Sequence, residues 1–151
     1  GLYTWWQRTF PHPSLLAFDA PTREECTADR ARSNTPQQAL VLLNDPTYVE
    51  ASKAFAGRIV REGGKETADR IRWAWREAVQ HDPAPADAAE VARLVDRFRE
   101  QFKADPRAAA AFLGVGMEPR QQGQEADTVE LAAWTNAARV ILNLHETMTR
   151  N

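Results

Sequence analysis

The stretch from Thr35 to Gly64, TPQQALVLLNDPTYVEASKAFAGRIVREGG, decides the fold class. Thr35 before Pro36, and Asp45 before Pro46, each combine an N-cap residue with proline at the first helical position. Apolar residues follow both signals at helical spacing, and a glycine pair ends the second segment. We therefore expect a short helix buried nearly all round, then a longer amphipathic one. The stripe of the longer helix consists of Tyr48, Ala51, Phe55 and Ile59.

Similar signals continue toward the C-terminus. Residues 67–80 form a third amphipathic segment, and residues 81–85 carry two prolines and are typical of a linker. Asp105 before Pro106 predicts a further helix, and Asp127 with Glu130 three residues later fits a capping box for the last one. The apolar stripe of this last helix runs from Val129 to Met148. The cleanest apolar stripe consists of Val91, Leu94, Val95, Phe98 and Phe102. The sequence thus predicts an all-α fold, with a bundle of about five or six helices over residues 35–151.

The first 34 residues differ from this pattern. They are rich in large apolar and aromatic side chains, but Pro11, Pro13 and Pro21 interrupt any long element. We expect residues 1–34 to be irregular chain pinned by its aromatics, within a single helical domain spanning residues 1–151.

Composition limits the classes of partner. The 151 residues carry a formal net charge of −2, which provides no strong field to attract nucleic acid. No apolar run approaches the roughly 20 residues that cross a bilayer. The single cysteine, Cys26, excludes an internal disulfide framework. Because the chain opens at Gly1, without an initiator methionine, and its aromatics are densest in its first ten residues, we expect it to be the C-terminal part of a larger protein.

Three stretches resemble a known family. They are FDAPTREEC (Phe18 to Cys26), RARSNTPQQALVLLND (Arg30 to Asp45) and LAAWTNAARVILNLHETMTR (Leu131 to Arg150), and LYTWWQR (Leu2 to Arg8) is similar to the family's entry into this region. Together they resemble the planctomycete domain of unknown function 1553. The sequence departs from that family at Gln38, where leucine is usual, and around His81.

The resemblance implies a context for the chain and no activity. It implies a large exported protein, located outside the cytoplasm, in which this module follows other uncharacterised domains. It also implies a cytochrome c-type domain, with haem c, elsewhere in that protein. We expect no cofactor within this chain.

One group of residues suggests binding. Arg30, Arg32 and Asn34 immediately precede the helix that begins at Thr35, where free backbone N–H groups and guanidinium groups suit an anion or carboxylate. The alternative, which we favour, is that the arginines pair with carboxylates such as Asp19 and fix an irregular segment. Either way, these are the candidate site residues.

Other candidates for chemistry are weak. His12, His81, His145 and Glu146 lack metal-ligand spacing, and we expect His145 to be a histidine at a helix end favoured by the helix dipole. We expect Cys26 to be a buried structural thiol rather than a nucleophile. No catalytic residue and no metal ligand is therefore assigned. Three tryptophans, Trp5, Trp6 and Trp73, could stack on sugars or fill a core or interdomain contact.

Three functions follow as alternatives. The first is a non-catalytic helical accessory domain that packs against upstream domains of the same polypeptide. The second is one wall of an enzyme active site that acts on polysaccharide, and the third is a carbohydrate-binding module. If the chain is an accessory domain, its polar groups should pair internally. If it is a wall of an active site, unpaired groups should face an open cleft. If it is a carbohydrate-binding module, exposed coplanar tryptophans should be present.

Overall fold

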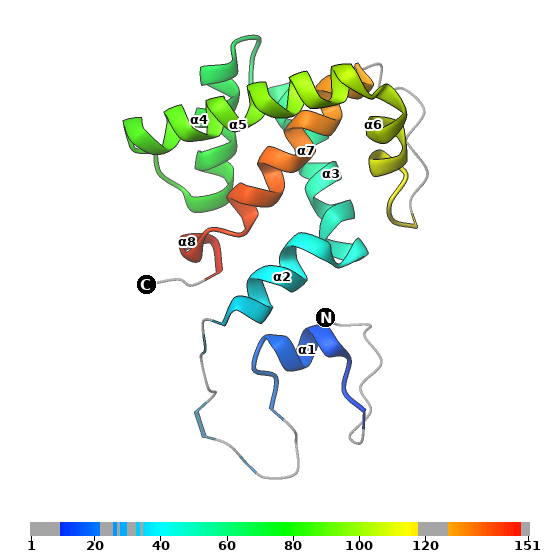
Figure 1. The fold of residues 1–151 in the computed structure, drawn as a ribbon. Helices are drawn as coiled ribbons and strands as arrows, with labels where there is room; N and C mark the ends of the chain where they lie inside the picture. The colour runs from blue at the N-terminus through cyan, green and yellow to red at the C-terminus, as the bar shows by residue number, and fades with distance from the viewer. Residues whose placement is uncertain are drawn as a thin grey trace. The chain divides into compact units, whose positions relative to one another are not determined.

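A computed structural model describes residues 10–21, 26, 28, 29, 33, 35–117 and 127–148 of the chain. These residues contain eight helices and no strand, which confirms the all-α prediction (Figure 1). The helices are α1 (Pro13–Ala17), α2 (Pro36–Asn44), α3 (Pro46–Glu62), α4 (Thr67–Val79), α5 (Pro85–Ala104), α6 (Pro106–Leu113), α7 (Thr128–Leu142) and α8 (His145–Met148). None of the helices in the described ranges is long and apolar enough to span a membrane.

Contacts divide the chain into two compact units, Gly1–Val41 and Leu42–Asn151. The division falls inside α2, seven residues beyond the boundary that the sequence suggested. The first unit contains α1, a single turn within the segment that was expected to be irregular. His12 caps this turn by accepting a hydrogen bond from the backbone N–H of Ser14.

The second unit is built around α7, which contacts α3, α4, α5 and α6 (Figure 1). Eight of the fifteen α7 residues are buried, so α7 is a central helix rather than an amphipathic one. Many of them are alanines, and the face of α3 toward the core carries Val49, Ser52, Ala56 and Ile59. Because Ser52, Ala56 and the alanines of α7 are small, the two helices can approach closely at these positions. The buried face of α3 therefore differs from the predicted stripe, in which Ala51 is exposed in the structure.

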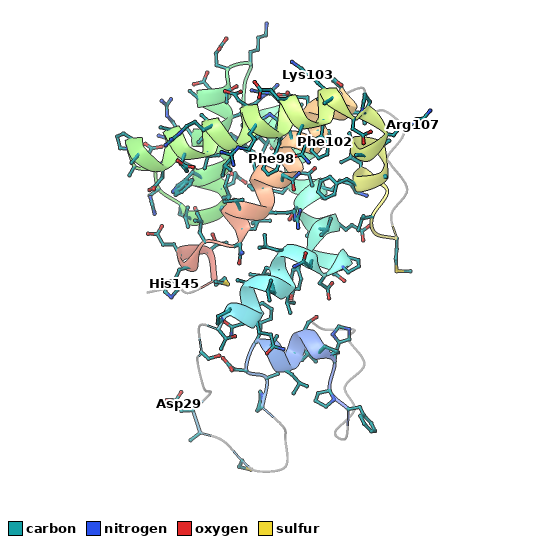
Figure 2. All side chains as sticks on the ribbon, in the orientation of Figure 1. Asp29, Phe98, Phe102, Lys103, Arg107 and His145 are labelled. Carbon is teal, nitrogen blue, oxygen red and sulfur yellow. The ribbon has the colours of Figure 1, made fainter. Side chains whose placement is uncertain are left out.

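Helix α5 packs against α7 through most of the apolar stripe that the sequence predicted. Val91, Val95 and Phe102 of α5 are buried, and Phe98 packs against the same core. Phe98 and Phe102 lie on the inner side of α5 (Figure 2). Lys103 of α5 and Arg107 of α6 point outward. Phe102 also stacks on Phe112 of α6, with ring centroids 6.0 Å apart.

Two predictions about helices were wrong. The last helix does not continue to Met148, because it ends at Leu142 with Asn143 as its C-cap, and α8 follows separately. Helix α2 is not buried all round: Gln38 is its only buried residue, and Leu40 is 59% exposed. Apolar composition predicted burial, but Leu40 is more than half exposed.

Candidate functional site

Of the four residues that the sequence selected, the structure describes Asp19. Its carboxylate accepts hydrogen bonds from the backbone N–H of Ser33 at 2.7 Å and from the Ser33 hydroxyl at 2.7 and 2.9 Å. The Gln38 amide is 3.5 Å away. The hydrogen bonds from Ser33 hold the pKa of Asp19 below its ordinary value. Arg30, Arg32 and Asn34 lie outside the described residues, so their pairing stays a prediction.

Gln38 is a further polar residue of this region, and it was not among the four that the sequence selected. Its side chain is 4% exposed, and its amide donates to the Ser33 hydroxyl at 3.1 Å. Its oxygen accepts from the backbone N–H of Thr35 at 3.3 Å, while the Thr35 hydroxyl accepts from the backbone N–H of Gln38 at 3.4 Å. This is a capping box, and the Thr-x-x-Gln spacing is the signal that could have identified it. The buried amide thus joins the start of α2 to the Ser33 and Asp19 pair.

A second polar cluster lies in the second unit, where α4, α5 and α7 meet. Its centre is the Glu130 carboxylate near the start of α7. Arg70 of α4 donates to it at 2.7 Å, and Arg99 of α5 donates through two nitrogens, each at 2.7 Å. The Trp134 indole N–H adds a fourth hydrogen bond at 2.8 Å. One carboxylate therefore holds three helices together through four donors.

The surroundings of this cluster strengthen it. The side chains of Arg70, Arg99 and Glu130 are only 15%, 20% and 23% exposed. Both guanidinium groups also lie over the Trp134 ring, 5.9 and 6.0 Å from its centroid. Arg99 further contacts Asp96 at 2.8 Å. The cluster is thus a closed network of opposite charges over a buried aromatic ring.

The pKa values in the cluster follow from this geometry. Burial opposes ionisation of Glu130, but the hydrogen bonds from Arg99 and Trp134 and the charges of Arg99 and Arg70 outweigh it, so the pKa of Glu130 lies below its ordinary value. The hydrogen bond to Glu130 raises the pKa of Arg99. An ionised carboxylate whose pKa is lowered in this way is a weak general base, because it holds a proton poorly. The predicted capping-box role of Glu130 is replaced by this one, although Asp127 does cap α7 through the backbone N–H of Val129 at 3.0 Å.

Arg139 forms a smaller junction near the end of α7. It donates to the Asn136 side chain at 2.8 Å and to the carbonyl oxygen of Leu43, and it lies 5.5 Å from the centroid of the Phe112 ring. Desolvation lowers its pKa, and its Nε is buried without a hydrogen-bond partner. Its two other nitrogens nevertheless donate to groups of the chain, one of them to the Leu43 carbonyl oxygen near the end of α2.

Of the remaining candidates, His81 and Glu146 contact each other, with the ring Nε2 3.2 Å from the carboxylate. Cys26 is exposed, so the expectation of a buried thiol was wrong. His145 is the first residue of α8 and not at a helix C-terminus, which removes the proposed dipole interaction. Among the described residues, no three histidine, cysteine or acidic side chains are grouped so that they could hold a metal ion.

Tryptophans within the described ranges are packed into the second unit. Trp75 and Trp134 are 5% and 0% exposed. Trp73, whose role the sequence left open, packs against the core, with its ring centroid 6.1 Å from that of Phe55 and Arg58 lying 5.1 Å above it. Trp5 and Trp6 lie outside the described residues.

A shallow groove of about 650 Å³ separates the first halves of α4 and α5. Its polar side chains already have partners. Asp82 accepts two hydrogen bonds from Arg76, at 2.6 and 2.9 Å, and Asp96 and Thr67 both accept from Arg99. Arg72 also lines the groove, and its guanidinium group lies 3.6 Å from the Asp69 carboxylate. The other lining residues are apolar: Ala68, Ile71, Pro83, Pro85, Ala88, Ala89 and Ala92. Each polar side chain of the groove thus already contacts another residue of the chain.

Comparisons with known proteins complete this picture. A family model described as PSD1, protein of unknown function (DUF1553), matches residues 1–95. The match includes two of the three stretches that carried the resemblance, while the stretch from Leu131 to Arg150 lies beyond it. No curated protein and no solved structure matches the chain. Because the family model covers more than half of the sequence, the chain belongs to the DUF1553 family.

Proposed function

We propose that this chain is a non-catalytic helical accessory domain, which packs against upstream domains of the same polypeptide. The observation that carries the proposal is that Glu130 is paired inside the chain. Its two carboxylate oxygens receive four hydrogen bonds from Arg70, Arg99 and Trp134, all within the chain. The carboxylate of Asp19 is likewise bonded to Ser33 and Gln38. Groups engaged in this way stabilise helix contacts and are not available to a substrate.

Exposed apolar side chains favour a protein partner. Phe10 and Leu16 in the first unit are 75% and 54% exposed, and Leu40 of α2 is 59% exposed. Large apolar side chains that gather on short, weakly buried elements are typical of surfaces that another protein covers. The partner in this proposal is the rest of the same polypeptide, because the family resemblance implies that this module follows other domains.

The wider context of the proposal rests on the resemblance alone. It includes a planctomycete source, a C-terminal position in the parent, an extracytoplasmic location and haem c on another domain. None of these features requires a ligand at the residues described above.

The two alternatives make different demands. A carbohydrate-binding module needs exposed aromatic platforms, whereas Trp73, Trp75 and Trp134 pack into the second unit. A wall of an enzyme active site needs unpaired acid or base groups facing a cleft, whereas the carboxylates of the groove between α4 and α5 are paired. Both observations favour the accessory role.

The test mixes this chain with the remainder of its polypeptide, produced as a separate chain. Size-exclusion chromatography with light scattering should show a one-to-one complex. The same samples are incubated with soluble polysaccharides, and reducing ends are measured with this chain present and absent. Absence of a complex would contradict the proposal. Polysaccharide cleavage or retention by this chain alone would contradict it as well and favour an alternative.

A further inference from the structure

His81 connects two segments that are far apart in the sequence. It lies in the connection between α4 and α5, and its Nε2 is 3.2 Å from the Glu146 carboxylate on α8. Its Nδ1 is 2.8 Å from the backbone carbonyl oxygen of Asp82. The imidazole ring therefore bridges this connection and the last described helix.

Both ring nitrogens of His81 face hydrogen-bond acceptors. The Asp82 carbonyl oxygen can only accept, and so can the ionised Glu146 carboxylate. A neutral imidazole carries one N–H, so it can satisfy only one of these contacts. The imidazolium ion carries two and satisfies both. The observed geometry therefore favours the protonated ring, because loss of the proton sets one lone pair against an acceptor.

Other charged groups around the ring act in the same direction. Asp82 is held by Arg76 of α4 through two hydrogen bonds, which fixes the carbonyl that His81 contacts. Arg72 of α4 also acts on Asp82, and the negative charges of Asp82 and Glu146 both favour the imidazolium ion. The pKa of His81 is raised first by the hydrogen bond to the Asp82 backbone, against some desolvation, and then by the hydrogen bond to Glu146.

Helix α8 is short and lies at the surface of the second unit. It is four residues long, and none of its residues is buried. It contacts α4 and α7, and the Thr147 hydroxyl donates to the Ile141 carbonyl oxygen at 2.9 Å. Leu144, just before α8, packs partly against the core. An attachment of this size can respond to the loss of a single ion pair.

We propose that His81 and Glu146 form a proton-dependent latch that holds α8 against the end of α4. Below the pKa of His81 the latch is closed, because both ring nitrogens donate. As the pH rises through that pKa the contact with Glu146 weakens, and α8 opens more often. Since the pair is exposed, the difference in opening should be modest, about two- to five-fold in the protection of α8 amides. The latch is independent of the accessory role and does not require a partner.

The experiment follows the three histidines of the chain by NMR between pH 5 and pH 8.5. His12 and His145 serve as internal references for His81. Glu146→Gln keeps the shape of the side chain and removes its charge, so it should lower the pKa of His81 toward the ordinary imidazole value. The amide signals of Thr147 and Met148 should titrate with the pKa of His81 in the unmodified protein. That inflection should disappear in both Glu146→Gln and His81→Gln.

Two controls separate the latch from general effects. His145→Gln removes the histidine next to Glu146 and should leave the inflection in place. Hydrogen exchange of α8 amides, normalised to amides of α3 in the same sample, should show the two- to five-fold change with pH only while His81 and Glu146 are both present. A pKa of His81 that is unchanged in Glu146→Gln would overturn the proposal. So would an α8 inflection that survives His81→Gln.

Discussion

Replacing Glu130 by glutamine is the perturbation that tests the cluster of Arg70, Arg99, Glu130 and Trp134 most sharply. The substitution keeps the size of the side chain and changes one oxygen to an N–H donor. That donor then faces guanidinium N–H groups that formerly met an acceptor 2.7 Å away. The two arginines would remain largely buried, at 15% and 20% exposure, without a negative charge between them.

The size of the effect can be worked from this geometry. Breaking a buried ion pair by removing one partner costs about 3 to 5 kcal/mol. Because the Glu130 side chain is 23% exposed, water recovers part of this, and we expect about 2 to 4 kcal/mol. For a chain of this size, such a loss lowers the melting temperature by about 5 to 15 °C. It is a large share of a typical stability of roughly 5 to 15 kcal/mol.

The assay is urea and thermal unfolding, followed by far-ultraviolet circular dichroism and tryptophan fluorescence. Glu90→Gln is the matched control, because it removes the same charge from an exposed pair with Arg93, where the side chains are 58% and 72% exposed. It should cost less than about 0.5 kcal/mol. Equal effects of the two substitutions would refute the reasoning, since burial would then contribute nothing.

The pH dependence gives a second readout of the same substitution. The pKa of Glu130 is lower in the folded protein than its ordinary value. Its ionised form therefore contributes stability that is present above the unfolded-state pKa and is lost as the pH falls through the lowered pKa. Glu130→Gln should flatten the acid side of the stability curve, and an unchanged acid side would contradict the lowered pKa of Glu130.

Three further predictions concern other positions. Trp134→Phe keeps the buried ring but removes its hydrogen bond to Glu130, and denaturant unfolding should show a loss of about 1 to 2 kcal/mol. Gly116→Ala should cost about 1 to 3 kcal/mol by the same measurement, because φ is +108° there and the new Cβ would lie 2.8 Å from the Glu50 carboxyl carbon; a neutral result would contradict the close approach. Ser33→Ala should raise the pKa of Asp19 toward its ordinary value in a carboxyl NMR titration, and an unchanged pKa would show that Ser33 is not the cause.

Local signals in the sequence located the helices well. Asp45 and Asp105 cap α3 and α6 through their side chains, as the Asp-Pro pairs predicted. A cap is formed by residues adjacent in the chain, so spacing alone identifies it. Burial depends on what other segments bring to the same place, and there the sequence was less informative.

The candidate site shows the same limit. Glu130 looked like one half of a capping box, but its partners Arg70 and Arg99 lie 60 and 31 residues away. No short pattern contains a pairing of that range. Gln38, in contrast, stood in a recognisable Thr-x-x-Gln spacing, and its amide bonds could have been expected from it.

The burial of α2 was overestimated. Its apolar residues indicate a helix that is covered by other segments, but a sequence does not show whether those segments belong to this chain or to another one. In the structure Leu40 is 59% exposed. This is the point at which the accessory role can be tested directly.

That test is hydrogen exchange of backbone amides in α1 and α2, measured in this chain alone and in the full-length parent protein under identical conditions. If the chain is an accessory domain that packs against upstream domains, amides of residues 14–17 and 37–44 should exchange more slowly in the parent, while those of α7 at the centre of the second unit should not change. Identical exchange of α1 and α2 in both samples would contradict the account, because their exposed apolar side chains would then have no partner in the polypeptide.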